Sequence, residues 1–117
     1  MSSVPSIRSI PEFENLILQR DGPFLEVWAE IPPKSLVALI NAERGWLTLF
    51  RYENDAGIVT VDPTCESDAD IPFRLSNGQV DHHPEYLCVS LEALKSAFAY
   101  FFETGDADPS LDWTEEP

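Results

Sequence analysis

Residues 81 to 88 gather side chains that are able to hold a metal ion: Asp81, His82, His83, Glu85 and Cys88. Imidazole, thiolate and carboxylate groups are the usual ligands of zinc. No second cluster in the chain completes a ligand set, and neighbouring residues of an extended segment point to opposite sides. We therefore interpret the segment as a solvated loop with one histidine half packed, and we expect neither a metal nor another cofactor.

Nucleophilic chemistry has equally little support. Cys65 or Cys88 beside a histidine could imitate a thiol nucleophile pair, but the two histidines are adjacent and precede a proline. The zinc-deaminase signature and the glycine-rich phosphate loops are absent. The cysteines show no CxxC spacing, so we expect free thiols. We expect that the chain is not an enzyme.

The charge of the chain is its most unusual total. Twenty-one acids against seven bases give a formal net charge of -14 at pH 7, and residues 66–117 hold twelve of the acids and two of the bases. Such a surface repels nucleic acid and anionic membranes and attracts basic proteins. The plainer alternative is that the charge only keeps the protein soluble.

No apolar run approaches the ~20 residues of a membrane span, so we expect a cytoplasmic protein.

Hydrophobic periodicity predicts helices at both ends of a run of strands. Residues 24–31 alternate, with Phe24, Glu26, Trp28 and Glu30 on one face. The predicted helices cover residues 11–20 and 90–105, and the predicted strands cover 24–31, 35–40, 46–53 and 58–62, followed by an acidic loop at 63–70 and a hairpin around 76–78. We expect one domain over residues 1–117, of α+β class, whose antiparallel sheet of about five or six strands has the N-terminal and C-terminal helices packed on one face.

The aromatic residues are expected to serve mainly as core. They are Trp28, Trp46, Phe98, Phe101 and Phe102. A stacking platform for single-stranded nucleic acid would need interleaved lysine and arginine, whereas acids lie beside these rings. Nucleic acid is therefore not an expected partner.

The C-terminal segment resembles a known family signature. A capped helix ends near Phe102 and is followed by Gly105, Pro109, Leu111 and Trp113, with Glu115 after them. This pattern is similar to that of the Imm-one type immunity proteins of bacterial polymorphic toxin systems. Upstream, the glycine before the apolar residues at 45–47 and a proline at position 84 fit the same order. The acidic stretches at 63–70 and 106–108 depart from the pattern, and only the last 25 or so residues are specific.

The resemblance implies a cognate inhibitor that binds a toxin, commonly a deaminase acting on nucleic acid, and blocks its active site or substrate groove. We expect a monomer that forms a heterodimer with this basic toxin. The acid-rich, turn-rich segments would contact it, namely Glu66, Asp68, Asp70, Asn77, Asp81, His82, His83 and Glu85. Two alternatives stay open: an acidic nucleic-acid mimic that inhibits another basic enzyme, and a small metal-dependent enzyme using His82 or His83.

The lone tryptophan of the acidic tail needs a place for its ring. We predict that Trp113 folds back beside the C-terminal helix, held by Pro109 and Leu111, while the acids between remain exposed. Truncation of Trp113 to alanine would then cost roughly 3–5 kcal/mol. The alternative is that Trp113 anchors the interface with a partner, because tryptophan is common among binding hot spots.

Overall fold

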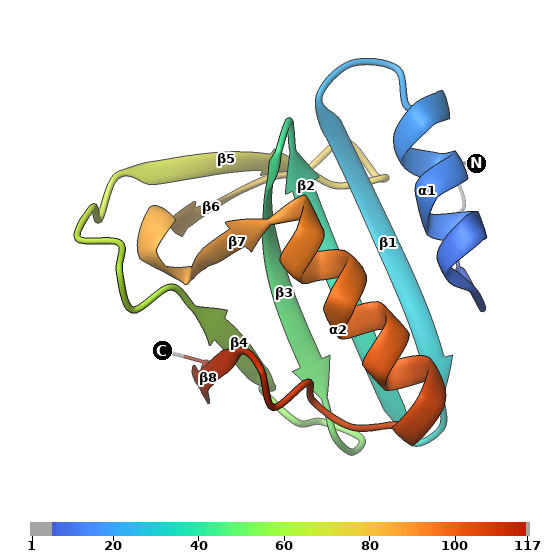
Figure 1. Cartoon of the computed structure of the whole chain (residues 1–117). Coiled ribbons are helices and arrows are strands. Elements are labelled where there is room, and N and C mark those ends of the chain that lie inside the picture. Colours follow the sequence, from blue (N-terminus) through green and yellow to red (C-terminus); the bar gives the residue numbers. More distant parts are fainter. Residues whose placement is uncertain (1–5, 117) are drawn as a thin grey trace.

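Two helices cover one face of an antiparallel sheet in the computed structural model, which describes residues 6–116 (Figure 1). In that part of the chain the main sheet has the strand order β1-β2-β3-β4-β8, with β7 beside β3. A separate two-stranded sheet pairs β5 with β6. The predicted α+β class and the antiparallel sheet with a helix from each end of the chain are confirmed.

The elements follow the predicted order closely. Their bounds are α1 (Ile10–Gln19), β1 (Phe24–Ile31), β2 (Lys34–Asn41), β3 (Arg44–Phe50), β4 (Ile58–Val61), β5 (Asp70–Arg74), β6 (Val80–Pro84), the 3-10 turn η1 (Glu85–Leu87), β7 (Cys88–Ser90), α2 (Leu91–Thr104) and β8 (Asp112–Glu115). Within residues 6–116, no helix combines the length and the apolar character needed to cross a membrane.

The face of the sheet under the helices is the main core. Helix α2 begins where the Ser90 hydroxyl accepts a hydrogen bond from the Ala93 N–H, and it ends at Gly105 in the left-handed conformation that favours glycine. Its Phe98 ring is fully buried and meets Phe13 of α1 edge to face at 5.3 Å. The two helices therefore seal this face together.

A close approach of α2 to β3 depends on Gly45. A Cβ atom at this position would overlap Cδ1 of Leu94, which is itself fully buried. Glycine is thus the residue that lets the Leu94 side chain lie flat on the start of β3.

The C-terminal tail folds back onto the core as the sequence predicted, but it also forms a strand that was not predicted. Trp113 is half-buried in β8, where it pairs with Thr60 of β4 and packs against the helix-covered core. Its indole N–H donates to the Asp108 carbonyl at 2.9 Å. This packing favours a structural role for Trp113 over the alternative of an interface anchor.

The expectation that every acid of the tail is exposed was wrong for Asp108. This residue is 4% exposed, and its carboxylate accepts hydrogen bonds from the Ser96 hydroxyl at 2.6 Å and from the Ser110 N–H and hydroxyl at 2.9 and 2.8 Å. Burial disfavours the charged form, but these hydrogen bonds outweigh burial and lower the pKa of Asp108. The acid joins the tail to α2 instead of facing solvent.

The β5–β6 hairpin lies against the other face of the sheet, behind the strands in Figure 1. Fully buried Phe73 of β5 packs with Leu39 and Cys88 in a second, smaller core. The Asn41 side-chain amide also donates to the Pro72 carbonyl at 2.9 Å, which joins β2 to β5. The hairpin covers only part of this face.

Candidate partner-binding face

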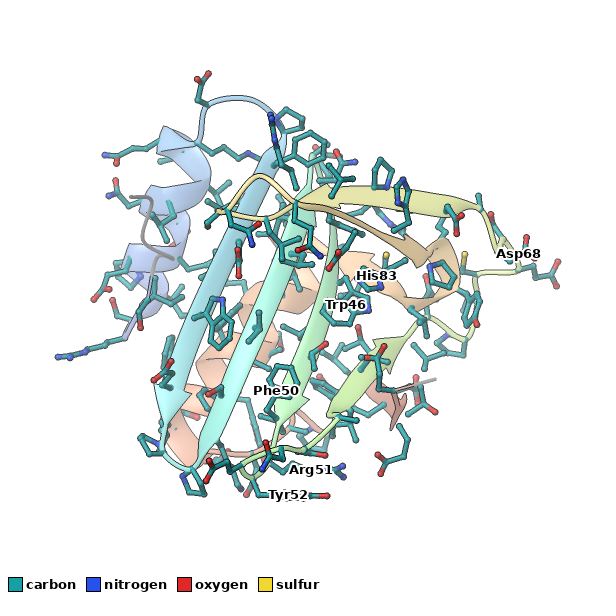
Figure 2. The ribbon with its side chains drawn as sticks, turned by 180° about the vertical axis from the view of Figure 1, so that it is seen from behind. Trp46, Phe50, Arg51, Tyr52, Asp68 and His83 are labelled. Atoms are coloured by element: carbon teal, nitrogen blue, oxygen red, sulfur yellow. The ribbon has the colours of Figure 1, made fainter. Side chains whose placement is uncertain are left out.

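The sheet face opposite the helices is divided into a covered half and an open half. Strand register places Glu26, Leu39, Trp46 and Cys88 in one cross-strand row, and this row lies under the β5–β6 hairpin. The next rows contain Trp28, Val37 and Thr48, then Glu30, Ser35 and Phe50. We call the side chains of these six residues the open face, because the hairpin ribbon does not extend over this part of the strands in Figure 2. Val37 and Thr48 are buried among their neighbours, at 4% and 0% exposed, whereas the other four are half-buried or exposed.

A stacked ring pair marks the border between the two halves. The His83 ring lies parallel to the Trp46 ring, with centroids 4.0 Å apart and planes 8° apart, and Figure 2 shows the pair near the middle of the face. Burial lowers the pKa of His83, although Asp81 acts in the opposite direction, so the imidazole is neutral at pH 7. A neutral imidazole against an indole is chiefly a packing contact.

Three polar atoms near this border are buried without a hydrogen-bond partner among residues 6–116: Trp46 Nε1, Thr48 Oγ1 and His83 Nε2. Buried polar groups are normally paired, and an unpaired one costs about 1–3 kcal/mol. The other two such atoms in the described residues are Arg44 Nε and Glu116 Oε2. The described side chains therefore leave some buried polar atoms of this face without a hydrogen-bond partner.

Glu26 connects the covered half to the open half. It is 7% exposed, and its two carboxylate oxygens accept the Ser76 N–H and the Trp28 indole N–H, each at 2.8 Å. The first bond holds the hairpin turn against β1, and the second fixes the orientation of the Trp28 ring. Glu26 is thus a positioning residue for the open face.

A shallow groove of about 460 Å³ lies at the end of the open face. Its lining combines ring faces with small polar groups: Trp28, Pro33, Ser35, Phe50, Tyr52, Glu53, Asn54 and Asp55. Tyr52 is 58% exposed and lies at the lower edge of the molecule in Figure 2, below Phe50. Exposed aromatic side chains beside a hollow are the type of surface found at binding sites.

The cation beside this groove is already neutralised. The Arg51 guanidinium donates to Asp55 at 2.8 and 3.0 Å and to Glu115 at 3.1 and 3.2 Å. These hydrogen bonds raise the pKa of Arg51 and lower that of Asp55. Arg51 therefore joins the 51–55 loop to β8 and has little capacity left for a ligand.

Four of the predicted contact residues lie at one end of the β5–β6 hairpin. Asp70 is opposite Pro84 in the strand register, and the Glu85 N–H donates to the Ala69 carbonyl at 2.9 Å. Glu66 and Asp68 are exposed in the adjoining loop, and Figure 2 shows Asp68 at the far edge of the molecule. We call Glu66, Asp68, Asp70 and Glu85 the acidic end.

The other four predicted residues are not brought together with the acidic end as one patch. Asn77 is exposed in the turn at the opposite end of the hairpin, where its carboxamide oxygen accepts the Gln79 N–H. Residues 81–83 form part of strand β6 and are not in a loop, which corrects the prediction. Asp81 and His83 are on the sheet-facing side with Phe73 and Ile71, whereas His82 is exposed on the outer side. One half-packed histidine was predicted correctly.

The possible catalytic side chains are arranged unfavourably. His82 and His83 lie on opposite sides of β6, so their imidazoles do not face one site, and residues 6–116 contain no group of three or more side chains arranged to hold a metal ion. Cys65 and Cys88 are free thiols, as expected. Burial raises the pKa of Cys88 to about 11, which keeps this thiol protonated and unreactive.

The open face is a feature that the sequence did not predict. The sequence predicts Trp28 and Trp46 in the core with the phenylalanines of α2, but both are half-buried on the opposite face. The signal was present, because the alternation of residues 24–31 already separated Trp28 from Val27 and Ala29. What the pattern could not show is which of the two faces the helices would cover.

Neither the protein-family models nor the curated proteins give a match to this chain. The resemblance to Imm-one type immunity proteins therefore rests only on the sequence pattern given above.

Proposed function

We propose that this chain is an immunity protein that acts in the cytoplasm, where it binds and neutralises a basic toxin of the nucleic-acid-targeting deaminase type. The observation that carries the proposal is the acidic end, where the exposed Glu66, Asp68 and Asp70 and the half-buried Glu85 gather on a chain of net charge -14. An enzyme that acts on nucleic acid presents a basic groove, and an acidic protein can occupy it. The C-terminal resemblance supports the same function.

The distribution of charge supports binding by the hairpin side of the molecule. No ion pair within residues 6–116 involves a carboxylate of the acidic end. These carboxylates are therefore free to contribute to long-range attraction of a basic partner. The open face lies on the same side of the sheet and offers aromatic surface, which the centre of a protein interface usually contains.

The test compares two charge-reversed variants of equal net charge. One replaces Glu66, Asp68 and Asp70 with lysine; the control replaces Asp21, Glu43 and Glu103, which are exposed acids elsewhere. Tagged wild type and both variants are used to recover partners from lysate of the native cell at about 50 and 200 mM salt. The basic protein recovered is then expressed alone and together with this chain, and cell growth and nucleic-acid deamination are measured.

The proposal predicts one partner that arrests growth alone and is inactive when this chain is present. The acidic-end variant should bind it at least about tenfold more weakly, chiefly through a slower association rate, whereas the control variant should lose much less. Recovery of no such partner, or of one whose activity continues in the complex, would contradict the proposed function. Equal losses in both variants would contradict the role of the acidic end.

A further inference from the structure

Two carboxylates at the groove at the end of the open face form no ion pair with a cation of the described residues. Glu53 lines it, and Glu30 projects on the same face because it lies in the row of Ser35 and Phe50. Neither carboxylate takes part in an ion pair within the described residues. Arg51, the cation at this place, is held by Asp55 and Glu115.

The lining also offers flat apolar surfaces, beside the polar side chains of Ser35, Asn54 and Asp55. Trp28, Phe50 and Tyr52 contribute aromatic rings, and Pro33 contributes its pyrrolidine ring. Glu26 restrains the Trp28 indole through its N–H, so one wall is already ordered before a ligand arrives. Flat rings with carboxylates beside them suit a planar cation that has an apolar stem, which is the description of an arginine side chain.

A contact of this kind already exists at the edge of the groove. The Arg51 guanidinium carbon lies 5.8 Å from the centroid of the Tyr52 ring while its nitrogens are bound by carboxylates. The same combination of ring and carboxylate is repeated inside the groove without a cation. A second groove lies between α1 and α2, and its carboxylate is already paired. There the Lys95 Nζ atom lies 3.7 Å from Oε2 of Glu14.

We propose that the groove receives one arginine side chain of the basic partner, stacked among Trp28, Phe50 and Tyr52 with its charge toward Glu30 and Glu53. This inference rests on the proposed function for its partner. It supplies the aromatic centre that the acidic end lacks. Arginine is preferred over lysine because the planar guanidinium stacks on rings and loses less hydration.

The test uses small peptides, so it does not depend on finding the partner. Acetyl-Gly-Arg-Gly-amide is titrated into the labelled protein and compared with the lysine, citrulline and leucine analogues. The chain has three tryptophans, so its indole N–H groups give three signals in a nitrogen–proton correlation spectrum. Trp28 reports on the groove, and Trp113 on the opposite face serves as an internal control.

We expect the arginine peptide to shift the Trp28 signal, to leave the Trp113 signal in place and to lose affinity as salt is added. The citrulline peptide, which keeps the shape without the charge, should bind roughly two- to tenfold more weakly. Tyr52→Ala and Glu53→Gln should each reduce the shift. Both residues are exposed, so these variants do not endanger folding.

Equal binding of the leucine peptide would overturn the inference and leave a plain apolar groove. Absence of any Trp28 shift at millimolar peptide would overturn it as well. The two proposals fail separately. If no toxin is found but the arginine peptide binds, the proposed function is wrong and the arginine-binding groove is supported. If a toxin is inhibited equally by wild type and Tyr52→Ala, the groove proposal is wrong and the proposed function is supported.

Discussion

The two faces of the sheet come from the same strands but are closed in different ways. On the helix-covered face the side chains of Leu36, Ala38, Ile40, Leu47 and Leu49 are at most 2% exposed, and helices α1 and α2 pack directly on them. On the opposite face the hairpin covers one half, and the other half leaves Trp28 and Phe50 partly exposed.

The difference shows how one strand can serve two purposes. Successive residues of β3 point to opposite sides, so Leu47 and Leu49 build the core while Trp46, Thr48 and Phe50 face the other way. Leu47 and Leu49 are enclosed by other apolar side chains of the core. The second group combines half-exposed rings with unpaired polar atoms and is the group that a partner could complete. Stability and binding are therefore expected to respond to different substitutions.

The largest expected effect comes from truncating a phenylalanine on each face. Phe98→Ala should lower the free energy of unfolding by about 3–5 kcal/mol, because its ring is fully buried between α1 and the sheet. Phe50→Ala should cost only about 1–2 kcal/mol, since its ring is partly in water already. Urea denaturation of both variants measures the difference. Equal losses would show that the open face is as tightly packed as the core.

A smaller effect is expected at the border of the helix-covered face. Trp113→Ala should cost about 2–3 kcal/mol, less than the sequence-based expectation, because the ring is half-buried. Trp113→Phe keeps most of the ring and loses the bond to the Asp108 carbonyl, so about 1 kcal/mol is expected. Urea denaturation should rank the two variants in that order. A large loss of partner affinity in a Trp113→Phe protein that remains folded would instead favour the interface role.

The contact between Gly45 and Leu94 can be tested by a double-mutant cycle. Gly45→Ala should cost about 1–3 kcal/mol, because the new methyl group would overlap the Leu94 side chain. In a Leu94→Ala background the same substitution should cost much less, since the obstructing atoms are gone. The cycle is measured by chemical denaturation. An equal cost in both backgrounds would mean that the helix does not approach β3 as closely as described.

Much of the fold could be predicted from the sequence because its signals are local. The alternation of residues 24–31 and the cap at Ser90 specified a strand and a helix start, and the structure has both. Strand β8 escaped prediction because its four residues are mostly acidic and polar, and they are ordered only by pairing with β4. The burial of Asp108 escaped for a similar reason, since Ser96 is twelve residues away.

The candidate site could be predicted only in part. Exposure of Glu66, Asp68 and Asp70 was readable from an acidic, turn-rich stretch. The groove could not be predicted, because strand pairing brings β1 next to the 51–55 loop. No local sequence pattern encodes that register. The opposite orientation of His82 and His83 followed from strand geometry, but the stacking of His83 on Trp46 is a tertiary contact.

The smallest expected effect concerns the pH dependence of stability at that stack. The pKa of His83 is lowered in the folded protein, mainly by burial and also by His82, while Asp81 opposes the shift and Trp46 and Phe73 add no charge. The unfolded chain, with an ordinary histidine pKa of about 6.5, therefore takes up a proton first as the pH falls. The stabilisation from neutral His83 is complete above that pH and decreases below it.

The matched variants His83→Phe and His82→Phe separate this contribution from the carboxylates, which also titrate in acid. His83→Phe keeps a ring against Trp46 and removes the proton site, so its melting temperature should fall less between pH 7 and pH 5 than that of the wild type. His82 is exposed on the outer side of β6, so His82→Phe should retain the wild-type slope. The reverse result would place the titrating histidine outside the stack.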